Sequence, residues 1–375
     1  MSYLNTIDRL CEAGLNPAKT IMATKEQTGK DLVGVFPIHT PDEIVYAAGC
    51  VPVGMWGGKA EIQLADKYLQ SFCCSIMRTN IEFAMRGTYN VLKAMIIPAF
   101  CDTLKCIVEN MKLATEVPVI PLTYPQHRDL KVGRDYAKNE ITRVRSELER
   151  VLGVMITEEK ISAAFDLYEE YRATMREFVE LAGQHPEIIT ARKRHLIIKA
   201  GEYMDKAIYT KDIKEINEGL KAAGESTFKG TKVVVTGLLS EPVEILEIFD
   251  ENNVAVVADD LSLGSRKWRT PAREDVKDVF EKMAYRIADQ IGDTFLYEAD
   301  KKKGQMLIDL VKEKGADAVV VMMMKFCDPE EYDYPIYKAE LAEAGVPELY
   351  LEIDQQLATF EQIRTRVQSF AEMLI

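Results

Sequence analysis

Three of the seven cysteines lie where an α/β protein commonly builds its active site. Cys101 follows the apolar run AMIIPAF, and Cys327 follows ADAVVVMMMKF. Cys74 belongs to the cysteine pair of SFCCSIMR, at the start of a helical pattern. Parallel sheets bind ligands at the carboxyl ends of their strands, so two of these positions are well placed for a shared site. Three thiolates from separate elements would form a soft site suited to an iron–sulfur cluster.

The sequence around Cys101 and Cys327 allows two interpretations. Each cysteine is followed by aspartate and opens a helical pattern, in CDTLK and in CDPEE. A helix N-terminus lowers the pKa of a thiol, and the same arrangement in both halves of the chain favours a metal or redox site. In the alternative, Asp102 and Asp328 are helix caps and each cysteine is only a small hydrophobe.

The other cysteines are expected to have structural roles. Cys73 and Cys74 cannot both point the same way, so at most one of them belongs to a shared site. Cys11, Cys50 and Cys106 are expected to be buried packing residues. The tetrapeptide Cys-x-x-Cys does not occur, which excludes zinc ribbons, thioredoxin motifs and ferredoxin-type cluster motifs.

Further polar and aromatic residues could serve such a site. Trp56 and Trp268 follow expected strands, where they would either pack at a rim or shield a reactive centre from water. The basic segment SRKWR at 265–269 is either a solvated loop or a contact for a phosphate-bearing substrate or a partner subunit. His39, at a strand end, could move protons or simply hold a loop.

Glycine-rich nucleotide motifs are absent: the chain contains neither G-x-G-x-x-G nor G-x-x-x-x-G-K. If ATP drives this system, another protein hydrolyses it. His185 and His195 fall in a helical segment and are expected on its surface.

Strands and helices that alternate along the chain are expected to position these residues. In the first half, Thr40 and Pro41 are expected to cap and begin a helix. The apolar runs between the helical patterns predict parallel strands that are covered on both faces. The strands are expected at 32–38, 51–56, 95–100, 117–122, 232–236, 254–258, 318–324 and 348–353. The helices are expected at 40–49, 71–86, 103–114, 134–152, 243–251, 272–291, 303–314, 334–344 and 360–374.

Residues 154–227 contain long amphipathic helical patterns and no strand signal. The predicted fold is therefore α/β, with two Rossmann-like parallel-sheet domains and a helical segment between them. The expected limits are 1–153 for the domain with Cys74 and Cys101, 154–227 for the helical segment, and 228–375 for the domain with Cys327.

Composition narrows the class of protein. The 375 residues include 47% hydrophobic and 29% charged side chains, an ordinary globular mixture. The net charge of −13 argues against a nucleic-acid surface, because phosphate binding needs clustered Lys and Arg. The first residues lack a signal-peptide pattern and no apolar run is long enough to span a membrane. A cytoplasmic protein with reduced thiols is expected.

Five stretches together resemble the 2-hydroxyacyl-CoA dehydratase family, which includes benzoyl-CoA reductase subunits. Their order and spacing carry the resemblance, and the length resembles that of the β-type subunit, in particular in dehydratases of (R)-2-hydroxyisocaproyl-CoA. The stretches are FPIHTPDEIVYAAGCVPVGMWG (36–57), CCSIMR (73–78), FCDTLK (100–105), DDLSLGSRKWR (259–269) and MKFCDPE (324–330).

The resemblance implies a heterodimer in which each subunit holds one 4Fe–4S cluster through three cysteines. Carried over motif by motif, the metal ligands in this chain are Cys74, Cys101 and Cys327, and a non-protein ligand completes the cluster. Cys74 is preferred to Cys73 because the family pattern places its cysteine before a small, two apolar and one basic residue, as in CSIMR.

The resemblance also implies a radical dehydration in anaerobic amino-acid fermentation. One electron added to the thioester carbonyl of a 2-hydroxyacyl-CoA gives a ketyl radical, which expels the hydroxyl group and acidifies the C3 proton. An ATP-hydrolysing iron–sulfur activator supplies the electron, the β cluster relays it, and the α subunit with its own cluster binds the substrate. The alternatives are a benzoyl-CoA reductase-like subunit and a non-enzymatic scaffold with structural cysteines.

Overall fold

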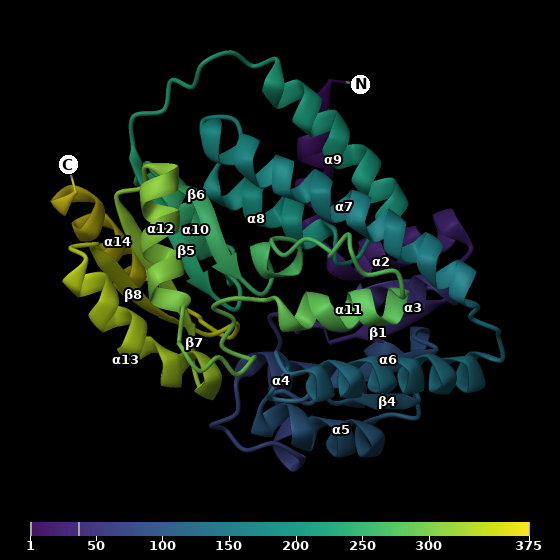
Figure 1. The fold of residues 1–375 in the computed structure, drawn as a ribbon. Coiled ribbons are helices and arrows are strands. Elements are labelled where there is room, and N and C mark those ends of the chain that lie inside the picture. The colour runs from purple at the N-terminus through teal and green to yellow at the C-terminus, as the bar shows by residue number, and fades with distance from the viewer. Residues whose placement is uncertain (1, 37, 375) are drawn as a thin grey trace.

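Two four-stranded parallel sheets organise the chain (Figure 1). The computed structural model describes residues 2–36 and 38–374. The first sheet has the order β2-β1-β3-β4 and the second has the equivalent order β6-β5-β7-β8. The strands are β1 Leu32–Val35, β2 Val51–Gly54, β3 Ala94–Pro98, β4 Val119–Leu122, β5 Thr231–Gly237, β6 Val254–Leu261, β7 Ala318–Met324 and β8 Glu348–Ile353. Both halves thus have the Rossmann-like parallel architecture that the sequence predicts.

The central strands form because their apolar runs can be buried on both faces. All seven residues of β7 are buried, and so are all eight of β6. A covered parallel sheet requires such continuous burial, whereas a half-exposed strand would alternate. β5 ends at Gly237, whose φ of 141° favours glycine and whose missing side chain leaves room for the carbonyl of Met322 on the neighbouring strand.

Helices cover both sheets. Those of the first half are α3 Asp42–Ala47, α4 Ser75–Met85, α5 Asp102–Ala114 and α6 Lys131–Leu152, with short 3₁₀ turns η1 Ala65–Lys67 and η2 Thr88–Val91. Those of the second half are α10 Glu244–Glu251, η3 Ser265–Lys267, α11 Val279–Ala288, α12 Lys303–Lys314, α13 Asp328–Glu343 and α14 Glu361–Met373. Among the described residues, no helix is both long enough and apolar enough to cross a membrane.

A separate group of helices lies between the two sheets in sequence and is joined in space by the N-terminus (Figure 1). It consists of α7 Glu158–Gln184, α8 Ala191–Ala200 and α9 Lys206–Lys221, together with α1 Tyr3–Leu15 and α2 Pro17–Thr28. The first helix packs on α8 and α9, and α7 contacts both α3 and β6. The predicted helical segment is therefore present, and it touches both halves.

One helix crosses from the second half to the first. α11 lies between β6 and β7 in sequence but packs against α6. Its residues Val279, Phe280 and Met283 belong to the same buried cluster as Val33 and Ile96 of the first sheet. The two halves are consequently interlocked rather than strung in series.

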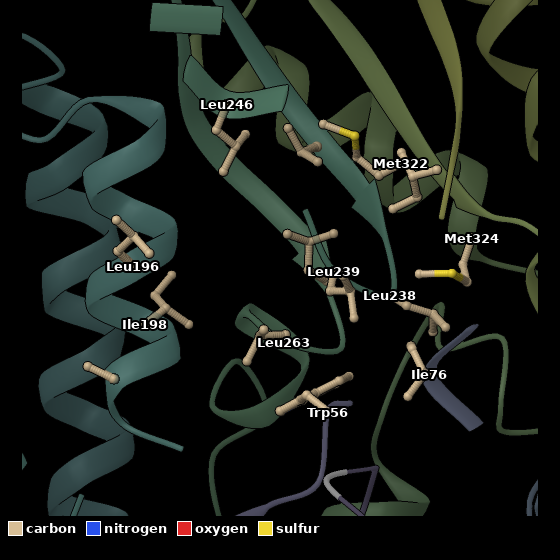
Figure 2. Packing of buried hydrophobic residues seen from close by; sticks show 14 of the residues in the cluster. Trp56, Ile76, Leu196, Ile198, Leu238, Leu239, Leu246, Leu263, Met322 and Met324 are labelled. Atoms are coloured by element: carbon tan, nitrogen blue, oxygen red, sulfur yellow. The ribbon is translucent and has the colours of Figure 1, made fainter. Parts of the chain in front are cut away.

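The two halves also share a hydrophobic core. Figure 2 shows Trp56 and Ile76 of the first half near Leu238, Leu263 and Met324 of the second half. All five belong to one cluster of buried side chains. Burial of apolar area at this contact is a main source of cohesion between the halves.

Several expected boundaries were wrong. The helix expected at 272–291 covers only Val279–Ala288, and α13 begins at Asp328 instead of 334. The strand expected to end at 258 continues to Leu261 because its two carboxylates are neutralised inside the protein. The strand expected at 32–38 ends at Val35, and position 37 of that range lies outside the described residues.

The start of α3 also differs from the prediction. Pro41 occupies the cap position, and the Thr40 hydroxyl donates a hydrogen bond to the carbonyl of Phe36 instead of capping the helix.

Candidate functional site

Three helices begin at the three candidate cysteines. Cys74 is the cap residue of α4, Cys101 of α5 and Cys327 of α13. The last two helices follow β3 and β7, which hold the same position in their respective sheets. The shared topology therefore places Cys101 and Cys327 equivalently, as the sequence indicated.

The three cysteines line one pocket, at the contact between the halves. Cys74 and Cys327 are 8% and 5% exposed, and Cys101 is half-buried. Cys73 is partly exposed, and it is not among the residues that line this pocket. The geometry thus supports Cys74 over its neighbour as the residue that faces the other two thiols.

Backbone N–H groups face each of these sulfur atoms. The amide of Leu104 donates to the Cys101 Sγ at 3.4 Å. Amides of Met77 and Ile76 face Cys74, and that of Glu330 faces Cys327, where each lowers the pKa of the thiol. Such donors, at the positive ends of three helices, stabilise negative charge on sulfur.

Burial nevertheless dominates the acidity of these thiols. It raises the pKa of Cys74 to about 12, that of Cys327 well above its usual value, and that of Cys101 in the same direction. The thiols also raise one another's pKa, since a second thiolate nearby repels the first. The amides at the helix N-termini lower these pKa values, as the sequence indicated, but burial outweighs them. Deprotonation here requires a compensating positive charge such as a metal centre supplies.

The arrangement of the three thiols bears on the kind of metal site that they could form. Within residues 2–36 and 38–374, no group of three His, Cys, Asp or Glu side chains could hold a metal ion. Cysteines that bind a cluster attach to different irons, so they line a common space without meeting at one point. Three thiols that line one pocket are a donor set that is chemically compatible with a cluster.

Apolar side chains from both halves form the rest of the pocket wall. Phe36 and Trp56 come from the first half, and Leu238 and Phe295 from the second. The Trp56 indole is 2% exposed and donates to the Glu202 carboxylate at 3.0 Å. Of the two interpretations of Trp56, shielding of the thiols from water is thus compatible with its place. Trp268 is also buried, but it does not line this pocket.

A buried network of charges supports the helix that begins at Cys327. Arg266 is 2% exposed and contacts Asp260 at 3.0 Å, Glu330 at 2.9 Å and Asp293 at 3.6 Å. Lys303 contacts Glu330 at 3.0 Å. Of the two interpretations of 265–269, the solvated loop does not fit Arg266, which bonds inside the protein.

The network fixes both sides of the pocket. Glu330 lies in the first turn of α13, three residues after Cys327. Asp293 lies 2.8 Å from the Nε2 of His39, whose ring packs edge-on against Phe100, next to Cys101. This hydrogen bond fits the simpler interpretation of His39, in which the side chain holds a loop.

The basic side chains of the network offset the effect of burial on the pKa of its carboxyl groups. Burial alone would raise the pKa of Asp260, but Arg266, Lys303 and Arg269 outweigh it and hold the carboxyl well below its usual range. Burial would likewise raise the pKa of Glu330, and Arg266 with Lys303 reverses the shift. Asp260 and Glu330 therefore stay ionised in the interior.

Sequence reasoning missed these supporting residues and misplaced three others. Glu330 could have been noticed as an acid in the first helical turn after a cysteine, whereas Asp293 and Lys303 had no local signal. His185 and His195 are buried rather than on the surface. The structural assignments of Cys11 and Cys50 agree with their burial, but Cys106 is exposed.

Comparison with known proteins identifies the family. The family model "2-hydroxyglutaryl-CoA dehydratase, D-component" matches residues 37–374. The β subunit of (R)-phenyllactyl-CoA dehydratase from Clostridium sporogenes is 40% identical, over 96% of each chain. The β subunit of lactoyl-CoA dehydratase from Anaerotignum propionicum is 42% identical, over 98% of each chain. That of (R)-2-hydroxyglutaryl-CoA dehydratase from Acidaminococcus fermentans is 37% identical, over 95% of this chain and 96% of the relative.

These matches span both sheets, the helical segment and all three cysteine-capped helices. The protein therefore belongs to the 2-hydroxyacyl-CoA dehydratase family, as a subunit of the β type.

Proposed function

We propose that this chain is the β subunit of a heterodimeric (R)-2-hydroxyacyl-CoA dehydratase, a lyase, and that Cys74, Cys101 and Cys327 hold a 4Fe–4S cluster in it. The observation that carries the proposal is the meeting of three cysteine-capped helices, from both halves of a family member, at one pocket. Soft thiolate ligands are the donors that iron–sulfur clusters use.

The cluster would supply a one-electron carrier that passes an electron from an ATP-dependent activator to the α subunit. The residues of this chain hold that carrier and keep water away from it. Three helix N-termini offset its negative charge, and the apolar wall with Trp56 and Phe295 gives the low dielectric in which such charge effects are strong.

The substrate is assigned by class. The relatives are named for phenyllactyl-, lactoyl- and 2-hydroxyglutaryl-CoA, which share the 2-hydroxyacyl thioester and differ in the acyl group. We therefore assign this chain to a 2-hydroxyacyl-CoA, with 2-hydroxyisocaproyl-CoA as the first compound to test, bound mainly by the α subunit in the cytoplasm of an anaerobe.

Iron and sulfide content after anaerobic purification tests the cluster. A Cys101→Ser variant should hold about four irons fewer per chain than the parent. The exposed Cys106, one turn further along the same helix, provides the matched control, because Cys106→Ser should keep the full iron content. Equal, near-zero iron content in the parent and in Cys101→Ser would contradict the cluster and favour the alternative of a non-enzymatic scaffold with structural cysteines.

The same measurement shows which residue of the cysteine pair is the ligand. Cys74→Ser should lose iron and Cys73→Ser should keep it; the reverse result would show that the neighbouring cysteine is the ligand.

Product analysis then shows which reaction the complex catalyses. The dehydratase returns its electron and forms 2-enoyl-CoA, so net reduction of the thioester would contradict it and favour a benzoyl-CoA reductase-like subunit.

A further inference from the structure

Trp56 also lines a second pocket, which contains none of the cysteines. This pocket has a volume of about 640 Å³ and is enclosed by α2, the end of β2, η2 and the loop before α10. Small-molecule sites in proteins typically measure roughly 300–1,000 Å³ and are mainly apolar. The size of this pocket is therefore that of a ligand site rather than of a packing defect.

The pocket is deep and its floor is apolar. Val53, Met55, Trp56 and Leu196 form the floor, and none of them is more than 4% exposed. Met22, at the mouth, is 44% exposed. The exposure of the lining side chains thus falls from the mouth to the floor. A narrow molecule could enter such a cavity, whereas a protein partner would need a flat apolar face.

The charged groups in the wall already have partners. Glu241 bonds to Lys199 and lies 3.2 Å from the Nε2 of His195. At the mouth, the Nζ of Lys59 and the Oε1 of Glu244 are 3.8 Å apart and both side chains are solvent-exposed. An occupant of the interior therefore needs no charge of its own, while a polar head group can remain at the mouth beside Lys59.

Trp56 and Met55 line both this pocket and the cysteine pocket. The hydrogen bond from the indole to Glu202 fixes the ring that both pockets share. A ligand in the larger pocket would thus contact residues that also line the cysteine site, without touching any of the three cysteines.

We propose that this pocket binds the acyl chain of a small carboxylic acid or of its thioester, with the chain inside and the head group at the mouth. A deep, mainly apolar cavity whose interior charges are paired, with an exposed Lys59 at its opening, fits that shape. The inference does not depend on the cluster: it concerns an apolar ligand site of this chain that none of the three thiols lines.

Calorimetric titration of the anaerobically purified complex with butyrate, hexanoate and octanoate tests the proposal. Each methylene buried in an apolar site should tighten binding about fourfold, so affinity should rise steadily along the series. Octanoyl-CoA against free CoA distinguishes a thioester ligand from a free acid. Affinity that does not depend on chain length, or no binding at all, would overturn the proposal.

A pair of variants locates the site. Ala18 is exposed on α2 and lines the mouth, so Ala18→Phe should narrow the entrance and weaken octanoate binding by about tenfold. Ala223→Phe, in the exposed loop after α9, adds the same ring elsewhere and should bind as the parent does. If Ala18→Phe does not fold, Met22→Trp at the same mouth replaces it. Parent-like binding by a folded mouth variant would refute this location.

Discussion

Buried charges in this protein are held in closed networks. Arg266 is the centre of one network, since it contacts Asp260, Glu330 and Asp293. A buried ion pair adds little net stability compared with apolar packing, but loss of one partner leaves an unpaired charge in the interior. Arg266 is therefore important for stability because it neutralises buried carboxylates.

Arg266→Leu should lower the free energy of unfolding by about 3–5 kcal/mol, because Asp260 and Glu330 lose a buried partner. Urea unfolding of parent and variant at neutral pH measures the change. Arg273→Leu is the control: its pair with Asp289 is partly exposed to solvent and should be worth at most about 1 kcal/mol. Equal losses in both variants would mean that the network does not stabilise the fold.

His195 gives a prediction for pH. Burial lowers its pKa, and Lys199 and Arg194 add to the lowering, although Glu241 opposes it. The folded protein therefore holds this imidazole neutral below its ordinary value of 6.5, where the unfolded chain takes up a proton. The contribution of the neutral His195 to the free energy of unfolding is fully present above pH 6.5, and it is lost as the pH falls below that value.

Compared with the parent, His195→Gln should consequently lose less stability on acidification. The free energies of unfolding of the two proteins should converge below pH 6.5, by up to about 1.4 kcal/mol per pH unit. Urea unfolding at a series of pH values measures this, and the exposed His127→Gln controls for the loss of a histidine. A constant difference between parent and His195→Gln from pH 7 to pH 5 would contradict the argument.

What the sequence reveals at this scale depends on how local the signal is. Cys101 and Cys327 follow apolar strands and open helices, a pattern visible within ten residues. The role of Arg266 could not be predicted, since its partners come from β6, from α13 and from the loop with Asp293. Charge pairing over such distances leaves no trace in local periodicity.

At the scale of elements, accuracy followed the strength of the boundary signals. The strands at 318–324 and 348–353 and the helix at 303–314 were predicted with the bounds that the structure has. Pro335 concealed the true start of α13, because a proline inside a helical pattern normally marks a boundary. The helix simply continues through it from Asp328.

The first turn of α13 has a testable function. Glu330 ties this turn to Arg266 and Lys303, whereas the neighbouring Glu331 is exposed. If Cys327 binds the proposed cluster, Glu330→Gln should release iron faster under a chelator and Glu331→Gln should behave as the parent does. Chelator-driven iron release, followed by absorbance under nitrogen, measures both. Identical rates of iron release in the two variants would show that the charge network does not help to retain the cluster.

At the scale of the whole molecule, sequence order and spatial order differ. α11 belongs to the second half by sequence but completes the core over α6, and the N-terminal helix packs on α8 and α9. We keep 1–153, 154–227 and 228–375 as a proposed division by sequence. Its parts are nevertheless expected to depend on one another for stability, because each leaves apolar surface that another covers.

A fragment of residues 1–153 tests this dependence. It lacks Val279, Phe280, Met283 and Ile287, which are buried against the first half. Full burial of such side chains is worth about 1.5–3 kcal/mol each, so their sum is comparable with the roughly 5–15 kcal/mol that stabilises a typical domain. The fragment should therefore show no cooperative urea transition by circular dichroism, and co-expression with residues 154–375 should restore one. A cooperative transition in the isolated fragment would show instead that the first sheet folds as an independent domain.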